Sequence, residues 1–239
     1  MGRMKPLSLD AYEQLAEAYA AMVDTKPHNA YYERPATLSL LPDVAGLRVV
    51  DAGCGPGVYS EWLVDNGARV VAFDASPKMV ALARRRVGDR VVIHEADVEG
   101  ELGFLDDGAF DVVLAPLVLD NVADWSKVFR RFRRALKPGG LLVFSVGHPF
   151  FEATYFKTDR YFETEQVSCV WRGSGFPVEM PSYRRPLGAV INSVLESGFE
   201  LVHILEPLPT EEFRNADPIG YERLARQPSF LCIKARRAA

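Results

Sequence analysis

The feature that most limits the possible folds is an alternation of short apolar segments with helix-like segments between residues 47 and 147. The apolar segments carry so few polar positions that both faces of each expected strand would be buried. Strands of this kind, separated by helices, predict a parallel sheet covered by helices on both faces. The expected strands are 47–53, 69–76, 90–97, 110–117 and 141–147.

The segments on either side of this alternation extend the prediction. Upstream, residues 9–23 have the periodicity of an amphipathic helix, followed by a broken stretch, TKPHNAYYERP, and a short helix over 36–41. Downstream, further strands are expected at 199–207 and 229–237, which brings the predicted sheet to seven strands. The helices expected beside them are 187–197 and 210–226.

Composition and charge exclude several classes of protein. The 239 residues are 48% hydrophobic, which excludes a wholly disordered chain. The net charge of −4 argues against a nucleic acid or an anionic membrane as partner, because such binders carry a basic surplus. Three scattered cysteines predict neither a disulfide framework nor a metal site. Without a signal-like N-terminus or a long apolar stretch, we expect a cytoplasmic monomer or homodimer that does not insert into membranes.

A glycine-rich turn joins the first expected strand to its helix. Its sequence, VVDAGCGPG, places Gly53, Gly55 and Gly57 where a ligand can approach bare backbone. The dinucleotide-binding pattern G-x-G-x-x-G is not met, because Val58 occupies the position of its third glycine. Asp51, which precedes the turn, would repel a pyrophosphate and suits a ligand with an ammonium group instead.

With these residues, the segment 47–147 resembles the class I S-adenosylmethionine-dependent methyltransferases, and the rest of the chain resembles them loosely. The resemblance implies a Rossmann-like sheet of seven mostly parallel strands, the last one antiparallel, with helices on both faces. It also implies S-adenosylmethionine as cofactor, S-adenosylhomocysteine as product, and no metal. The turn KPGG before the fifth expected strand belongs to the same pattern.

The resemblance assigns cofactor contacts residue by residue. Asp51 and the turn Gly53–Gly57 would hold the methionine part, and the carbonyl of Ala115 would meet its ammonium. Asp74 would accept both ribose hydroxyls, although an acid there also suits a helix cap. Tyr19, with Tyr31 and Tyr32 as alternatives, would close over the cofactor. The residues expected around the adenine are Ala75, Met79, Asp97 and Val98.

The resemblance also suggests how one domain is divided. We expect a helical cap over 1–42, a cofactor-binding core over 43–147, a substrate lid over 148–185, and the C-terminal part of the sheet over 186–239. The lid segment is rich in aromatic residues without a clear period. It suits an apolar acceptor pocket, and it equally suits the burial of a loose insertion.

Methyl transfer from a sulfonium requires a positioned nucleophile, and a base only where that nucleophile carries a proton. His148, directly after the fifth expected strand, is the predicted base, with His28 and Asp120 as alternatives; His148 and Asp120 also suit capping roles. We expect a small, partly apolar acceptor, methylated on oxygen, nitrogen or carbon. The alternatives are an RNA or protein methyltransferase, and a non-catalytic regulatory protein that binds the cofactor.

Overall fold

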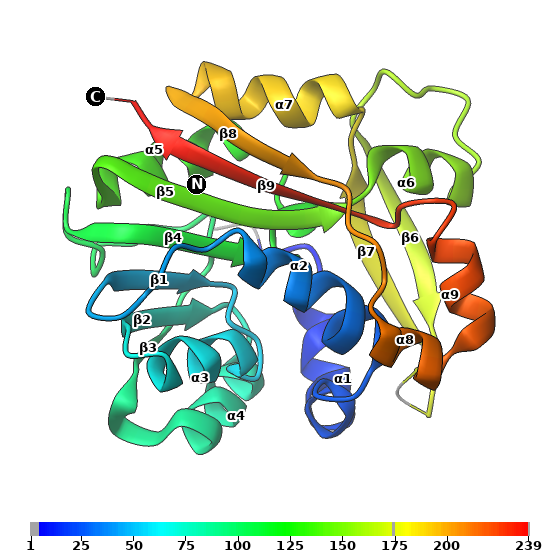
Figure 1. Ribbon diagram of the computed structural model, residues 1–239, viewed down its shortest axis with the longest axis horizontal. Coiled ribbons are helices and arrows are strands. Elements are labelled where there is room, and N and C mark those ends of the chain that lie inside the picture. The colour runs from blue at the N-terminus through cyan, green and yellow to red at the C-terminus, as the bar shows by residue number, and fades with distance from the viewer. Residues whose placement is uncertain (1–4, 174, 239) are drawn as a thin grey trace.

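A sheet of seven strands runs through the middle of the molecule (Figure 1). The computed structural model describes residues 5–173 and 175–238, so parts of the expected cap, lid and C-terminal segment (1–4, 174 and 239) lie outside it. The predicted α/β sheet with an antiparallel last strand is confirmed, since β9 pairs antiparallel with β5 and β8 and the other pairs are parallel. The strand order is β3 (Val92–Glu95), β2 (Arg69–Asp74), β1 (Arg48–Ala52), β4 (Phe110–Pro116), β5 (Leu136–Gly147), β9 (Phe230–Arg237) and β8 (Phe199–Leu205).

The sheet separates two apolar layers, which explains why its central strands are apolar at nearly every position. In β4, Val113 belongs to the layer beneath one set of helices and Val112 to the opposite layer. Helices of one layer are α5 (Trp125–Ala135) and α7 (Leu187–Glu196). Helices of the other are α2 (Arg34–Ser39), α3 (Val58–Asp65) and α4 (Pro77–Val87).

The N-terminal segment is helical over more of its length than predicted. After α1 (Leu9–Met22), the expected broken stretch contains a π-helix, Asn29–Glu33, that continues directly into α2. The prediction of a break over this stretch was wrong, because Pro35 lies in the first turn of α2 without interrupting the helical path that leads into it. Figure 1 shows α1 beside the carboxyl ends of β1, β2 and β4.

The aromatic segment 148–185 contains regular structure that the sequence analysis missed. It folds into α6 (Pro149–Tyr155) and an antiparallel hairpin of β6 (Glu165–Trp171) and β7 (Val178–Arg184). Along β6, half-buried residues alternate with exposed ones. This period of two was present in the sequence, but the many aromatic residues around it obscured the alternation.

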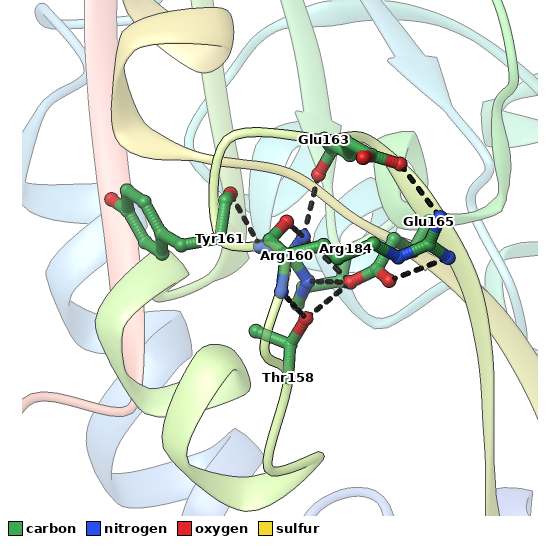
Figure 2. Close-up of polar contacts among 6 residues, drawn as sticks. All are labelled: Thr158, Arg160, Tyr161, Glu163, Glu165 and Arg184. Atoms are coloured by element: carbon green, nitrogen blue, oxygen red, sulfur yellow. Dashed lines mark hydrogen bonds and ion pairs between the residues drawn. The ribbon is translucent and has the colours of Figure 1, made fainter.

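The base of the hairpin is held by Arg184, whose side chain is fully buried. Its Nε and Nη2 donate to Glu165 Oε2 at 3.0 and 2.8 Å, across the pair of strands. The same guanidinium donates to backbone carbonyls of the loop that leads into β6, as Figure 2 shows. The carbonyls are those of Arg160, Tyr161 and Glu163. One side chain therefore joins the loop and both strands.

The helices near the C-terminus are shorter than predicted. The expected helix over 210–226 is two helices, α8 (Glu211–Ala216) and α9 (Pro218–Leu224). They separate because Asp217 accepts a hydrogen bond from Gly220 N–H and caps α9, which begins at a proline. Within the described part of the chain, no helix is both long and apolar enough to cross a membrane.

Candidate active site

A pocket lies at the carboxyl ends of β1, β2 and β4, with α1 forming part of its wall. This is the edge at which open parallel sheets bind ligands. Eight of the eleven residues predicted to contact the cofactor line it: Tyr19, Gly53, Gly55, Asp74, Ala75, Met79, Asp97 and Val98. Of the three candidate tyrosines, only Tyr19 is among them. Tyr32 is fully buried, and its hydroxyl accepts a hydrogen bond from Ser229 N–H.

The other three predicted contacts lie behind the pocket wall. Asp51 and Ala115 are fully buried, and at the end of β4 it is Pro116 and Leu117 that face the pocket. Gly57 packs against α4, where a Cβ would lie 3.0 Å from the Cα of Ala83. The direct cofactor contacts assigned to these three residues stay predictions.

The backbone conformation and the packing at position 53 both require a glycine. Gly53 has a positive φ of 70°, and a Cβ there would lie 2.5 Å from Cγ2 of Val118. The N–H groups of Gly53 and Cys54 both donate to the carbonyl of Phe73 on β2. The loop is therefore held close to the end of β2, where Asp74 lies.

Both carboxylate oxygens of Asp74 accept hydrogen bonds from backbone N–H groups. Its Oδ2 accepts from Gly55 N–H and its Oδ1 from Ser76 N–H, each at 2.9 Å. Burial raises the pKa of Asp74 despite these hydrogen bonds. The alternative role as a helix cap is filled by Ser76, whose hydroxyl accepts from Met79 N–H in α4. Because each carboxylate oxygen accepts more than one hydrogen bond, Asp74 retains acceptor capacity toward the pocket.

Asp51 lies directly beneath the glycine loop. Ser60 Oγ donates to its Oδ2 at 2.6 Å, while Oδ1 has no hydrogen-bond partner among the described residues. Burial raises the pKa of Asp51 to about 7. An acid with one buried oxygen unsatisfied is poised to interact with a nearby positive group.

Arg34 is a pocket residue that the sequence analysis missed. It is the single basic residue among the described residues that line the pocket. Its Nη2 donates to the carbonyl of Val23 at 2.7 Å, and its buried Nε has no partner among the described residues. The sequence shows this arginine in the segment YYERP, but a break was predicted there, and a residue in a break was not expected to line the site.

The neighbouring Glu33 fastens this part of the cap to the sheet. Its Oε1 accepts from Thr37, Tyr59 and Ser145, the last of these on β5. Burial raises the pKa of Glu33, and these donors act in the opposite direction. The guanidinium of Arg34 is therefore carried on a firmly held segment, and a π-helix at such a place is typical of functional sites.

The turn after β4 has a strained backbone. Leu117 adopts a positive φ of 53°, which is rare for a bulky residue and is found mainly where the surrounding structure imposes it. Its N–H donates to the carbonyl of Ser145 on β5 at 3.0 Å. This turn places Leu117 and Val118 in the pocket wall, with Val118 against Gly53 of the glycine loop.

The predicted catalytic histidine occupies a structural position. His148 is 5% exposed and does not line the pocket. Its Nδ1 accepts from Phe150 N–H and so caps α6, and its Nε2 lies 2.8 Å from Glu206 Oε1. His28 packs edge-on against Phe213, with its pKa lowered by burial. A role as base stays a prediction for both histidines.

Asp120 accepts a hydrogen bond from Gly147 N–H, and its neighbour Asn121 lines the pocket. Asn121 Oδ1 in turn accepts from Ser8 Oγ at 2.6 Å. Among the described residues, no group of three or more His, Cys, Asp or Glu side chains is placed to hold a metal ion.

Comparison with known proteins places this pocket in a family. Residues 50–144 match the model of a methyltransferase domain. An S-adenosylmethionine-dependent methyltransferase from Mesorhizobium loti is 31% identical, with a TM-score of 0.70 over 90% of this chain and 100% of that one. A structure from Listeria monocytogenes shares the fold at 24% identity, with a TM-score of 0.76 over 94% of this chain and 99% of that one.

A curated relative matches less than half of the chain. A ubiquinone biosynthesis O-methyltransferase of Xanthomonas oryzae is 38% identical over 105 residues, which are 43% of this chain and 44% of that protein. This chain therefore spans less than half the length of that relative, whereas its match to the Mesorhizobium structure is nearly complete. From that match, and from the pocket at the end of the sheet, the chain belongs to the S-adenosylmethionine-dependent methyltransferases.

Proposed function

We propose that this methyltransferase transfers the methyl group of S-adenosylmethionine to a small, partly apolar acceptor. The observation that carries the proposal is the arrangement of charge around the pocket. Asp74 lies at the end of β2 and the fully buried Asp51 lies beneath the glycine loop, while Arg34 is the single basic residue among the described lining residues. A cofactor with hydroxyls, an ammonium and a carboxylate matches these three groups.

The unsatisfied atoms fit the methionine part of the cofactor. Asp51 Oδ1 and Arg34 Nε are buried and without partners among the described residues, and they carry opposite charges. Since buried polar atoms are normally paired, each suits one charged end of an amino acid. Asp51 would face the ammonium and Arg34 the carboxylate.

The remaining pocket residues suit the nucleoside part. Asp74 would accept hydrogen bonds from the ribose hydroxyls with the acceptor capacity that its two backbone donors leave free. Met79 is almost fully buried, and with Ala75 it offers an apolar surface to the adenine. Asp97 and Val98 line the same pocket and would meet the adenine amino edge.

A small acceptor is supported by the way the pocket is covered. Tyr12 and Tyr19 on α1 line it, and the Tyr19 ring packs edge-on against Trp171 of β6 at 6.0 Å. Lys26 lies over the same Trp171 ring at 4.4 Å. The net charge of −4 does not favour nucleic acid. The Xanthomonas relative, named for ubiquinone biosynthesis, agrees with an acceptor that is partly apolar.

The test is a methyl-transfer screen with S-adenosylmethionine labelled on its methyl group. The protein is incubated with metabolite extracts, total RNA and a protein extract, and the labelled product is identified by mass. An Asp74→Ala variant is the matched control, because it should bind the cofactor more weakly while leaving the acceptor side intact. At a cofactor concentration near the wild-type Kd, we expect label in a small molecule with the wild-type protein and much less label with the variant.

Each other outcome rejects part of the proposal. Label in RNA or protein would replace the small-molecule acceptor with a macromolecular one. Tight cofactor binding by calorimetry without transfer to any fraction would favour a regulatory protein that binds the cofactor. Tighter binding of NAD than of S-adenosylmethionine would overturn the assignment of the pocket.

A further inference from the structure

Two carboxyl groups that the proposed cofactor site does not use meet at the end of β5. Asp120 lies in the 3₁₀ turn Leu119–Asn121 after β4, and its Oδ2 accepts from Gly147 N–H at 3.0 Å. Glu152 lies on α6, and a Cβ built on Gly147 would be 2.5 Å from its Oε1. Both carboxyl groups therefore lie against Gly147, the last residue of β5.

Glu152 is a buried acid near two arginines. It is 8% exposed, and the charges of Arg184 and Arg185 act on its carboxyl. The hydrogen bonds of Arg184 go to Glu165 and to the loop before β6 (Figure 2). Arg185 donates to backbone carbonyls of Val122, Ala123 and Tyr183. Both guanidinium groups therefore act on Glu152 through their charge.

The surrounding charges keep a proton on the pair. Burial raises the pKa of Asp120 and of Glu152, and the charge of Asp120 raises the pKa of Glu152 further. Arg184 and Arg185 act in the opposite direction. The other titratable groups around the pair and its arginines are Tyr12 on α1, Glu99, Cys169 on β6 and Tyr183 on β7. Because the two acids interact, they share one proton near neutral pH and titrate as a unit.

The pair lies next to the cofactor pocket. Asn121, which follows Asp120, lines that pocket, and so does Tyr12. Burial raises the pKa of Tyr12 to about 12, and the charges of Asp74 and Asp120 add to this effect. The carboxyl ends of β4 and β5 are thus occupied by proton-accepting groups beside the place where the cofactor would bind.

We propose that Asp120 and Glu152 form the base of the acceptor site and that the acceptor is a small molecule methylated on a hydroxyl or an amine. This inference rests on the proposed function. It replaces the predicted base, His148, whose ring nitrogens cap α6 and contact Glu206.

The proposed step is balanced as follows. The oxygen or nitrogen lone pair of the acceptor forms a bond to the methyl carbon, and the carbon–sulfur bond breaks with its electron pair going to sulfur. The acceptor proton passes to the singly protonated carboxyl pair, which then holds two protons and returns one to water. The products are the methylated acceptor and S-adenosylhomocysteine. A carboxyl pair suits this step because it accepts a proton near neutral pH.

The experiment uses the acceptor identified by the extract screen and measures kcat and KM from pH 5.5 to 8.5. The variants are Glu152→Gln and Asp120→Asn, with Glu179→Gln as matched control at an exposed position of β7, where it accepts a hydrogen bond from Ser168. We expect both variants to lose about 10²–10⁴-fold in kcat while keeping the calorimetric affinity for S-adenosylmethionine within threefold. The control should behave as wild type.

The wild-type pH profile gives a second test, which does not require any variant to fold. Its kcat/KM should rise from pH 5.5 toward neutral pH as the pair releases the second proton. A flat profile, a product methylated on carbon, or wild-type kcat in both variants would overturn this proposal. Those results would leave the proposed function standing, whereas a wild-type protein that transfers no methyl group at all would reject the proposed function itself.

Discussion

The glycine loop and the segment from α6 to β7 both border the carboxyl ends of the central strands, but different forces hold them. The loop is fixed by backbone: Gly53 has a positive φ, and the loop N–H groups bond to Phe73 and Asp74. The α6–β7 segment is fixed by long side chains, chiefly Arg184 and Arg185. A region fixed by backbone leaves a short motif in the sequence, whereas a region fixed by distant side chains leaves none.

The largest expected effect on the loop side comes from Asp74→Ala. The variant removes the acceptor for two ribose hydroxyls and for two backbone N–H groups, and each lost bond costs about 0.5–1.5 kcal/mol, more where charge is involved. Affinity for S-adenosylmethionine should fall about 10–100-fold, as measured by calorimetric titration. Asp65→Ala, on the exposed side of α3, is the control. Unchanged affinity in a folded Asp74 variant would contradict the ribose assignment.

The next prediction distinguishes binding of the amino-acid end of the cofactor from binding of its nucleoside end. Arg34→Met removes the single cation among the described lining residues, so S-adenosylmethionine should bind about tenfold more weakly. Methylthioadenosine, which lacks the amino-acid part, should bind as it does to wild type. Equal weakening of both ligands would show that Arg34 supports the cap rather than the carboxylate.

The pH dependence of cofactor binding should be smaller, with a defined sign. Asp51 has a pKa raised to about 7 by burial, and a nearby ammonium favours its ionised form. Cofactor binding should therefore release a proton, and affinity for S-adenosylmethionine should rise severalfold from pH 6 to 7.5. Subtracting the profile of methylthioadenosine removes the contribution of Asp74. Asp51→Asn should flatten the difference; a difference that persists would place the titrating group elsewhere.

The same raised pKa predicts how Asp51 affects stability. Its folded pKa lies above the unfolded value of about 3.9, so the folded state binds more protons between these values. The contribution of Asp51 to the free energy of unfolding should therefore decline as pH rises from about 4 to 7. Thermal unfolding of wild type and Asp51→Asn without cofactor measures that decline.

The smallest expected effect is on the α6 side. His148→Ala removes the acceptor for Phe150 N–H, and losing such a cap costs about 1 kcal/mol of unfolding free energy. His148→Asn supplies another capping acceptor and should restore most of that stability. Denaturant unfolding measures both variants. A fall in kcat of about 10²–10⁴-fold, with unchanged stability, would instead return His148 to the role of base.

The glycine loop and the α6–β7 segment also differ in how much of their structure could be predicted from the sequence. The seven strands could be placed because their apolar runs are local, and the antiparallel last strand followed from the family resemblance. Gly53 and Gly55 follow from the motif and line the pocket, whereas Gly57 of the same motif packs against α4. Arg34 was missed because a proline next to it suggested a break, although Pro35 lies in a helical first turn.

The acceptor side could not be predicted in the same way. Asp120 was predicted only as an alternative to His148 as the base, and no role was predicted for Glu152. Their proximity depends on the close approach of α6 to Gly147, which no local pattern in the sequence expresses. The contact of His148 Nε2 with Glu206 likewise joins two residues far apart in the chain. Contacts of this kind require the folded structure.

The hydrogen bonds of Glu33 bear on how ligands enter and leave. Because Glu33 is bound to Tyr59 and Ser145, we expect the second half of the cap to stay on the sheet during exchange of product for fresh cofactor. If any part of the cap moves, we expect it to be α1, which packs on α4 through an apolar cluster and through the exposed ion pair of Glu17 with Arg85. Such pairs are weakened by salt. Stopped-flow exchange of S-adenosylhomocysteine should therefore become faster as ionic strength rises, and a rate that does not depend on salt would mean that ligands pass without movement of α1.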